Sequence, residues 1–286
     1  MSRFLILVNP SSHGGRSARR LPQLKRLLPD GEFVVLENIE EARRKAREAE
    51  GFESIVACGG DGTVNAVAGG VLENPDPSLK FGALYTGTSP DFCREHGIPL
   101  DPARALETLR TGEVREIPVL AANGVPFLCS INLGMGAAVA ASANALRPRL
   151  GDFAGTLWPV VRETLHSRRY DIAADDEMLC GIIHALVTRM PRIAGGMRLA
   201  LPPLAEDEYA LWMVRNVSRA GALALIWKLF RGKSCGEFRI LRGRTEFSSA
   251  APVAVEYDGD PHGALPVAVD FYPRRLKLIA PPQGEN

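Results

Sequence analysis

The sequence has no apolar stretch that approaches the roughly 18 residues needed to cross a membrane. Its first apolar run, Phe4–Val8, is too short for a secretion signal and is followed at once by Asn9-Pro10. The five cysteines are scattered without a Cys-x-x-Cys pair, and the five histidines show no metal-type spacing. We therefore expect neither a disulfide framework nor a zinc site, and a reducing cytoplasm is the simplest setting.

An excess of charge is missing as well, because 34 basic residues face 33 acidic ones and the net charge is +1. A protein dedicated to nucleic acid usually carries a clear basic excess, so nucleic-acid binding is not expected. The hydrophobic fraction of 46% and the charged fraction of 23% are those of an ordinary globular protein. A chain of 286 residues should form one large or two modest domains.

Short apolar runs alternate with helical patterns over the first 110 or so residues. The runs Phe4–Val8, Phe33–Leu36, Ser54–Cys58 and Phe81–Tyr85 predict strands, and Pro102–Arg110 predicts one of the helices. Strands that alternate with helices pair in parallel. We predict an α/β N-terminal domain over residues 1–120, with an open, mostly parallel sheet and flanking helices.

The pattern changes near residues 112–126, and strand-like runs then dominate. Asn123-Gly124 is a hairpin signal, because both residues tolerate the positive φ of a tight turn. Helical patterns interrupt the strands only at Phe153–Leu165 and Ala220–Phe230. We predict a mainly β, sandwich-like C-terminal domain over residues 121–286, whose last strand could return to the first domain.

A glycine-rich turn, Gly59–Thr63, joins the strand Ser54–Cys58 to a predicted helix. Glycines let backbone N–H groups approach a ligand closely, and a helix N-terminus adds unpaired donors and a partial positive charge. An ordinary strand-to-helix turn is the alternative, but Asp61 and Thr63 favour a phosphate site. The turn matches neither the Walker A pattern nor the Gly-x-Gly-x-x-Gly fingerprint.

Two other polar loops follow predicted strands. Asn9–Gly15 comes directly after the first strand, and Thr86–Asp91 comes after the fourth. Because ligands of open α/β sheets bind at the carboxyl ends of the strands, we expect these loops and the glycine turn to face one crevice.

The order of these motifs resembles the diacylglycerol kinase catalytic family, which includes bacterial lipid kinases and sphingosine kinases and is distantly similar to NAD kinases. The motifs that carry the resemblance are Asn9-Pro10 with Gly14-Gly15, Gly59–Thr63 with Asn65, and Gly87-Thr88 with Asp91-Phe92 and Arg94. Asn132–Gly136, Ala194–Met197 and Asp258–Asp260 follow in the expected order and extend the likeness over essentially the whole chain.

The resemblance implies an ATP-dependent phosphotransferase that uses Mg²⁺ and transfers the γ-phosphoryl group to a lipid hydroxyl, such as that of diacylglycerol. The β-rich domain would then hold the acceptor. The residues implied to bind the nucleotide are Asn9, Ser11, Ser12, Gly59, Gly60, Asp61, Gly62, Thr63, Asn65, Gly87 and Thr88.

Carboxylates supply the remaining expected roles. Mg²⁺ prefers oxygen ligands, so Asp61 and Asp91 are candidates to hold it, and the resemblance implies a second, structural site at Asp207. Asp260 matches the catalytic base, with Asp61 as the other catalytic residue. From the residues alone, a hairpin turn is the favoured interpretation of Asp258-Gly259-Asp260, because Asp-Gly is a strong turn signal.

Several positions depart from the family pattern. Pro90 replaces an Asn, Ala66 replaces a Glu, and Asp260 is one methylene shorter than the family's Glu. These changes leave open a nucleotide-binding protein of the same fold with weak or no kinase activity, or a kinase that acts on a non-lipid hydroxyl.

The segment Arg219–Lys233 places Leu223, Ile226, Trp227 and Phe230 at helical spacing among basic residues. Such a pattern predicts either a helix packed on the β domain or one lying on an anionic bilayer. We expect a cytoplasmic protein; peripheral contact with the inner face of the membrane and a homodimer stay open.

Overall fold

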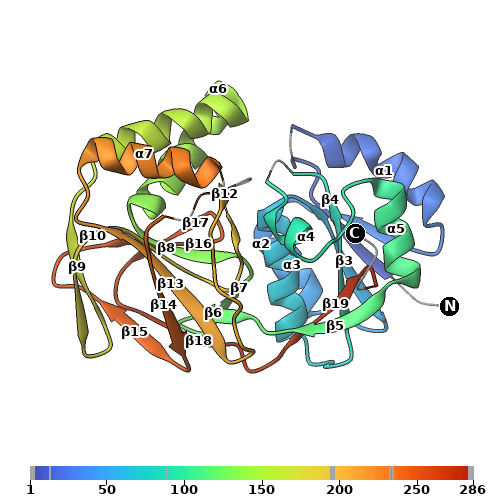
Figure 1. Cartoon of the computed structure of the whole chain (residues 1–286). Helices are drawn as coiled ribbons and strands as arrows, with labels where there is room; N and C mark the ends of the chain where they lie inside the picture. Colours follow the sequence, from blue (N-terminus) through green and yellow to red (C-terminus); the bar gives the residue numbers. More distant parts are fainter. Residues whose placement is uncertain are drawn as a thin grey trace. The chain divides into compact units, whose positions relative to one another are not determined.

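A computed structural model of the chain describes residues 4–12, 14–87, 89–193, 197–231, 233 and 235–282. The chain divides into two compact units (Figure 1). The first consists of Met1–Val119 together with Tyr272–Asn286, and the second of Leu120–Phe271. The first is α/β and the second mainly β, so the fold class predicted from the sequence is confirmed.

The first unit is built on a six-stranded sheet in the order β2-β1-β3-β4-β19-β5. All neighbours pair in parallel except β19 and β5. Strands covered on both faces are apolar throughout, and every residue of β1 and β3 is buried. The strands are β1 (Phe4–Val8), β2 (Glu32–Val35), β3 (Ser54–Gly59), β4 (Lys80–Tyr85), β5 (Glu113–Ile117) and β19 (Leu276–Ala280).

Helices cover both faces of this sheet (Figure 1). They are α1 (Arg16–Leu27), α2 (Ile39–Arg47), α3 (Asp61–Glu73), α4 (Asp91–Glu95) and α5 (Pro102–Thr111). Leu24 of α1 and Leu106 of α5 share one buried cluster with the strands, whereas α3 lies against β3 and carries α2. The α2–α3 packing requires a glycine, because a Cβ at Gly70 would lie 2.3 Å from the carbonyl oxygen of Arg43.

The second unit contains an eleven-stranded sheet in which all neighbours are antiparallel. Its core includes Phe127, Tyr209 and Phe247, all essentially buried. The strands are β6 (Leu120–Ala122), β7 (Val125–Phe127), β8 (Ser130–Gly134), β9 (Tyr170–Ala174), β10 (Glu177–Thr188), β13 (Glu208–Arg215), β14 (Glu237–Arg242), β15 (Thr245–Ser248), β16 (Ala254–Tyr257), β17 (Asp260–Ala264) and β18 (Val267–Phe271). A separate short pair is formed by β11 (Arg192–Ile193) and β12 (Met197–Arg198).

Two helices accompany this sheet, α6 (Met135–Leu165) and α7 (Arg219–Phe230). The sequence predicted only the second half of α6; the structure extends it back to Met135, across a non-helical Gly151 (φ 75°, ψ 170°). The first half escaped prediction because its many alanines form no stripe of large apolar residues. Over the residues that the structure describes, neither of these helices nor any other is long and apolar enough to span a membrane.

The segment Pro126–Leu133, which follows the Asn123-Gly124 turn, is divided between two strands in the structure. Leu128 and Cys129 lie between β7 and β8, and their backbone N–H groups donate to the Asp258 carboxylate at 2.7 and 2.8 Å. The side chain of Asp258 thus replaces a strand partner at this point.

Helix α7 packs on the β domain through a face that the sequence did not indicate. Ala222 and Leu229 are buried, and Leu225 packs against the cluster that contains Trp212. Trp227, from the predicted apolar stripe, is 55% exposed. The other stripe side chains, of Leu223, Ile226 and Phe230, lie outside the part of the chain that the structure describes.

Candidate functional site

The loops after β1, β3 and β4 meet at the carboxyl edge of the parallel sheet. The N–H of Asn9 donates to the carbonyl of Cys58 at 2.9 Å, and the N–H of Thr86 donates to the carbonyl of Gly59 at 2.8 Å. Each outer loop is therefore tied by its backbone to the central glycine turn.

Side chains connect the first loop to the glycine turn. The amide of Asn9 donates to the Thr63 hydroxyl at 2.9 Å, and its carbonyl oxygen accepts the N–H of Ser11 at 3.0 Å. Asn9 thereby fixes both its own loop and the first turn of α3. Gly59 is required beneath them, because a Cβ there would lie 2.4 Å from the Thr63 hydroxyl oxygen.

A chain of hydroxyl groups connects the first loop to the third. The Ser17 and Thr86 oxygens lie 2.6 Å apart, and Thr86 donates to Ser12 at 3.3 Å. All three residues are buried. Buried hydroxyl groups of the first loop and of the first turn of α1 are thus in contact with the third loop.

The second and third loops approach backbone to backbone. A Cβ on Gly87 would lie 2.6 Å from the Cα of Gly60, closer than any real Cβ contact allows. Glycine at both positions keeps the turn narrow and leaves its N–H groups uncovered by side chains.

Helix α3 begins inside this arrangement. Its N-cap residue, Gly60, has no side chain to bond the first N–H groups. The first turn of a helix therefore presents donors and a partial positive charge, which suits a phosphate group. The same turn contains Gly62, Thr63 and, further along, the half-buried Asn65.

Tyr85 joins Asp61 to the third loop. The Tyr85 hydroxyl donates to Asp61 Oδ2 at 2.7 Å and accepts the N–H of Ser89 at 3.0 Å. Burial and the nearby Asp61 carboxylate raise the pKa of Tyr85, so its hydroxyl remains a neutral donor. Tyr85 was not among the site residues predicted from the sequence, although it stands at the end of β4, at the sheet edge where ligands of open α/β sheets bind.

Asp91 and Thr88 are the other predicted residues of the third loop and its helix. Asp91 is the first residue of α4 and is buried, while Thr88 lies outside the described residues. Among the residues described, no cluster of three or more His, Cys, Asp or Glu could hold a metal ion. Asp61 offers a carboxylate in the first turn of α3, and carboxylate oxygens are ligands that Mg²⁺ accepts.

Asp207 is on an exposed turn of the second unit. Its carboxylate lies 3.7 Å from the Arg242 guanidinium, and the neighbouring Glu208 is itself paired with Arg242. An arginine so close to both acids does not suit a cation site. The role of Asp207 as a metal ligand stays a prediction that this arrangement does not support.

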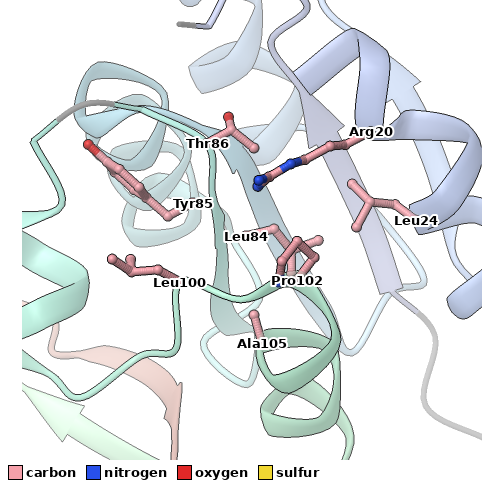
Figure 2. Close-up of a pocket in the computed structure, with 8 residues that line it drawn as sticks. All are labelled: Arg20, Leu24, Leu84, Tyr85, Thr86, Leu100, Pro102 and Ala105. Carbon is pink, nitrogen blue, oxygen red and sulfur yellow. The ribbon is translucent and has the colours of Figure 1, made fainter. Parts of the chain in front are cut away.

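A small pocket adjoins the third loop (Figure 2). Arg20 extends from α1 toward Thr86 and the end of β4, and the remaining lining is apolar except for Tyr85. Arg20 also faces Cys58, whose thiol pKa burial raises to about 12. Cys58 is consequently an inert core thiol and Arg20 a cation at the ligand edge of the sheet.

Asp258-Gly259-Asp260 forms the turn of the β16–β17 hairpin, as one of the two readings of the sequence expected. Asp258 and Gly259 have positive φ values of 49° and 99°, and Tyr257 pairs with Asp260. The Asp258 carboxylate accepts three backbone N–H groups. Asp260 itself is exposed.

Beneath this turn lies a buried acid that sequence reasoning missed, Glu256, which is 2% exposed. Its carboxyl group accepts from the amide of Asn132 and from the N–H of Gly259. Burial raises the pKa of Glu256 to about 8 and that of Asp258 to about 6, against the hydrogen bonds that favour their charged forms. The turn therefore combines an exposed acid with one that binds its proton near neutral pH.

Two family models match the chain. Residues 3–122 match the diacylglycerol kinase catalytic domain. Residues 129–280 match the YegS C-terminal NAD kinase beta sandwich-like domain.

Individual proteins match over most of their length. The chain is 31% identical to a "Probable lipid kinase YegS-like" of Pseudomonas aeruginosa over 84% of this chain and 82% of that protein. It is 25% identical to the "Diacylglycerol kinase" of Bacillus subtilis, over 98% of this chain and 97% of the relative. The crystal structure of a diacylglycerol kinase from Bacillus anthracis has the same fold, with a TM-score of 0.77 at 20% identity, covering 98% and 97% of the two chains.

Proposed function

Since the chain belongs to the diacylglycerol kinase catalytic domain family, we propose that it transfers the γ-phosphoryl group of ATP to a hydroxyl group of a lipid, with diacylglycerol as the first candidate. The observation that carries the proposal is the meeting of the three loops around the uncapped start of α3.

The glycine turn would bind the ATP phosphates. Phosphoryl transfer needs alignment and charge neutralisation more than covalent help. Part of this alignment and charge neutralisation would come from the N–H donors of Gly62 and Thr63 and from the hydroxyl of Ser12. The hydrogen bond from Asn9 keeps Thr63 oriented. Asp61, oriented by Tyr85, would hold Mg²⁺ with the phosphates. The ion, when bound, neutralises charge on the phosphate oxygens.

The acceptor hydroxyl must lose a proton as it attacks the phosphorus. An exposed carboxylate such as Asp260 is suited to accept that proton. Asp258 holds the turn that carries Asp260 through its three N–H contacts, and the amide of Asn144 on α6 donates to the carbonyl of Gly259 at 2.8 Å. A base on such a fixed turn keeps its distance to a bound hydroxyl, on which the rate depends steeply.

Transfer of label from γ-³²P-ATP to diacylglycerol in detergent micelles tests the proposal. Asp61→Asn should lower kcat/KM by about 100-fold or more, because it removes charge at the phosphates. Asp260→Asn should lower kcat while leaving the KM for ATP nearly unchanged. The matched controls are the exposed Asp30→Asn in the first unit and Asp176→Asn on another hairpin of the second, both of which should retain activity.

Three results would contradict the proposal in different ways. ATP binding without label in any lipid, or in any other hydroxyl acceptor, would favour a nucleotide-binding protein without kinase activity. Label found only in a non-lipid acceptor would support kinase activity and contradict a lipid as the acceptor. Full activity in both site variants would reject the assigned residues.

A further inference from the structure

Two of the three tryptophans in the chain are exposed on the helices of the second unit. Trp158 on α6 is 59% exposed and Trp227 on α7 is 55% exposed, whereas Trp212 in the sheet is 4% exposed. Tryptophan is highly buried on average, and its apolar ring with a polar N–H favours the boundary between membrane and water. A pair of exposed tryptophans on neighbouring helices therefore indicates a surface that binds a partner or a membrane.

The part of α6 that follows Gly151 has a continuous apolar face. Ala154, Leu157, Trp158, Val161 and Leu165 recur at helical spacing. Leu157 and Leu165 are 48% and 41% exposed, so this face is turned to solvent and not to the sheet. A helix normally buries such a stripe.

Helix α7 runs against α6 (Figure 1) and exposes Trp227 on the side opposite its buried residues, Ala222 and Leu229. The two helices together form what we call the α6–α7 surface. Its described members are Leu157, Trp158, Leu165, Trp227, Lys228 and Arg231.

The charge beside these tryptophans is positive. Residues 216–236 contain no Asp or Glu and have four cations, Arg219, Lys228, Arg231 and Lys233, whereas the preceding Arg215 is paired with Glu237. Lys228, Arg231 and Lys233 are exposed, and the Arg231 guanidinium stands over the Trp227 ring at 3.7 Å. On α6, Glu163 is engaged by Ser142 and Arg162.

Exposed tryptophan rings with cations beside them match an anionic bilayer. The rings enter the membrane interface, and the cations contact the lipid headgroups. A second copy of the chain fits less well, because a symmetric contact would bring like charges together. We propose that the α6–α7 surface docks the protein on anionic phospholipid membranes. This rests on the proposed function, since a lipid acceptor is reached at a bilayer.

Sedimentation with phosphatidylcholine vesicles, with and without phosphatidylglycerol, measures the docking directly and without ATP. The full chain should bind the anionic vesicles, and high salt should weaken the binding. Trp158→Ala with Trp227→Ala should lower the partition coefficient by about tenfold or more. Lys228→Ala with Lys233→Ala should lower it by about fivefold per cation on anionic vesicles only.

Met178→Ala with Ile240→Ala is the matched control. Both side chains are large, apolar and exposed (57% and 40%) on strands of the same unit, so this variant should bind as the wild type does. Circular dichroism melting of every variant establishes that it is folded. Tryptophan fluorescence that shifts to the blue with vesicles, and is lost in Trp158→Phe with Trp227→Phe, would support contact at these rings.

The proposal is overturned if the tryptophan variant binds vesicles as the wild type does. It is also overturned if neither the wild type nor the tryptophan variant sediments with vesicles, and light scattering shows that the wild type is a dimer and the variant a monomer. Measurement of kinase activity distinguishes failure of the docking proposal from failure of the proposed function. A docking variant should phosphorylate a dispersed short-chain diacylglycerol at the wild-type rate and lose activity only on vesicles, whereas a protein without lipid kinase activity would still sediment with them.

Discussion

Replacing Glu256 by Gln should make the protein more stable at alkaline pH and change its stability little in acid. Glu256 is 2% exposed, and its two carboxyl oxygens face Asn132 and the N–H of Gly259. Gln has nearly the same shape. Its oxygen can accept from Gly259, and its NH₂ can donate to Asn132 once that amide is turned.

The size of the effect follows from the pKa of Glu256, which burial raises from 4.5 to about 8. Between these pH values the folded protein binds more protons than the unfolded chain, so the free energy of unfolding falls as the pH rises. One pKa unit corresponds to about 1.36 kcal/mol, so the full loss is about 5 kcal/mol above pH 8. Gln cannot ionise and avoids the loss; because the turn relaxes around the charged form, we expect a gain of about 2 to 4 kcal/mol near pH 9.

Urea unfolding near pH 5, 7 and 9, followed by circular dichroism, measures the difference. Glu246→Gln on β15, an exposed acid of the same sheet, is the control and should show no comparable gain. The reasoning is refuted if the difference in the free energy of unfolding between Glu256→Gln and wild type is constant across this pH range, or if the gain is smaller near pH 9 than near pH 5.

Three further outcomes are expected. Asn74→Ala should lower the free energy of unfolding, measured in urea, by about 2 to 3 kcal/mol. The buried amide donates to the carbonyls of Ala46 and Ala49 and accepts the N–H of Asp76. A loss no larger than that caused by replacing an exposed Asn with Ala would contradict this prediction. Tyr85→Phe should lower the free energy of unfolding by about 1 to 2 kcal/mol, because the N–H of Ser89 loses its acceptor, and should lower kinase activity about tenfold, since Asp61 loses its donor. Iodoacetamide should label the exposed Cys180 in the native protein, while Cys58 and Cys93, whose pKa values burial raises, should react only after unfolding, as mass spectrometry of the peptides would reveal.

The architecture of the first unit was predictable because parallel strands leave a strong signal. β1 and β3 are buried on both faces, so their sequences are apolar throughout, and each ends at a polar loop. The sequence left the place of β19 open, with a return to the first domain as one alternative, because Leu276–Ala280 would suit either sheet. In the structure β19 pairs with β4 and β5, which places it in the first sheet. This pairing depends on contacts between segments far apart in sequence, which leave no local signal.

The second unit was harder to predict because its edge strands are polar. All five residues of β17 are exposed, and they include Pro261 and Gly263, which favour a turn in any local reading. The candidate site divides in the same way. Glycines and hydroxyl residues indicated the three loops at the sheet edge, whereas Glu256 resembles any other strand glutamate in sequence and is distinguished only by its burial in the fold.

Pro90 is the departure from the family pattern that lies in the third of the loops at the sheet edge, and its place in the structure limits the effect of replacing it. It is the N-cap residue of α4, where a helix does not need the N–H that proline lacks. The N–H of Ser89 is bound to Tyr85, and the carbonyl of Pro90 accepts from Arg94. Pro90→Asn should therefore alter the free energy of unfolding by less than about 1 kcal/mol and the Kd for ATP by less than about threefold. Calorimetric titration measures the second quantity, and a tenfold gain in ATP affinity would instead mean that the proline restricts the nucleotide site.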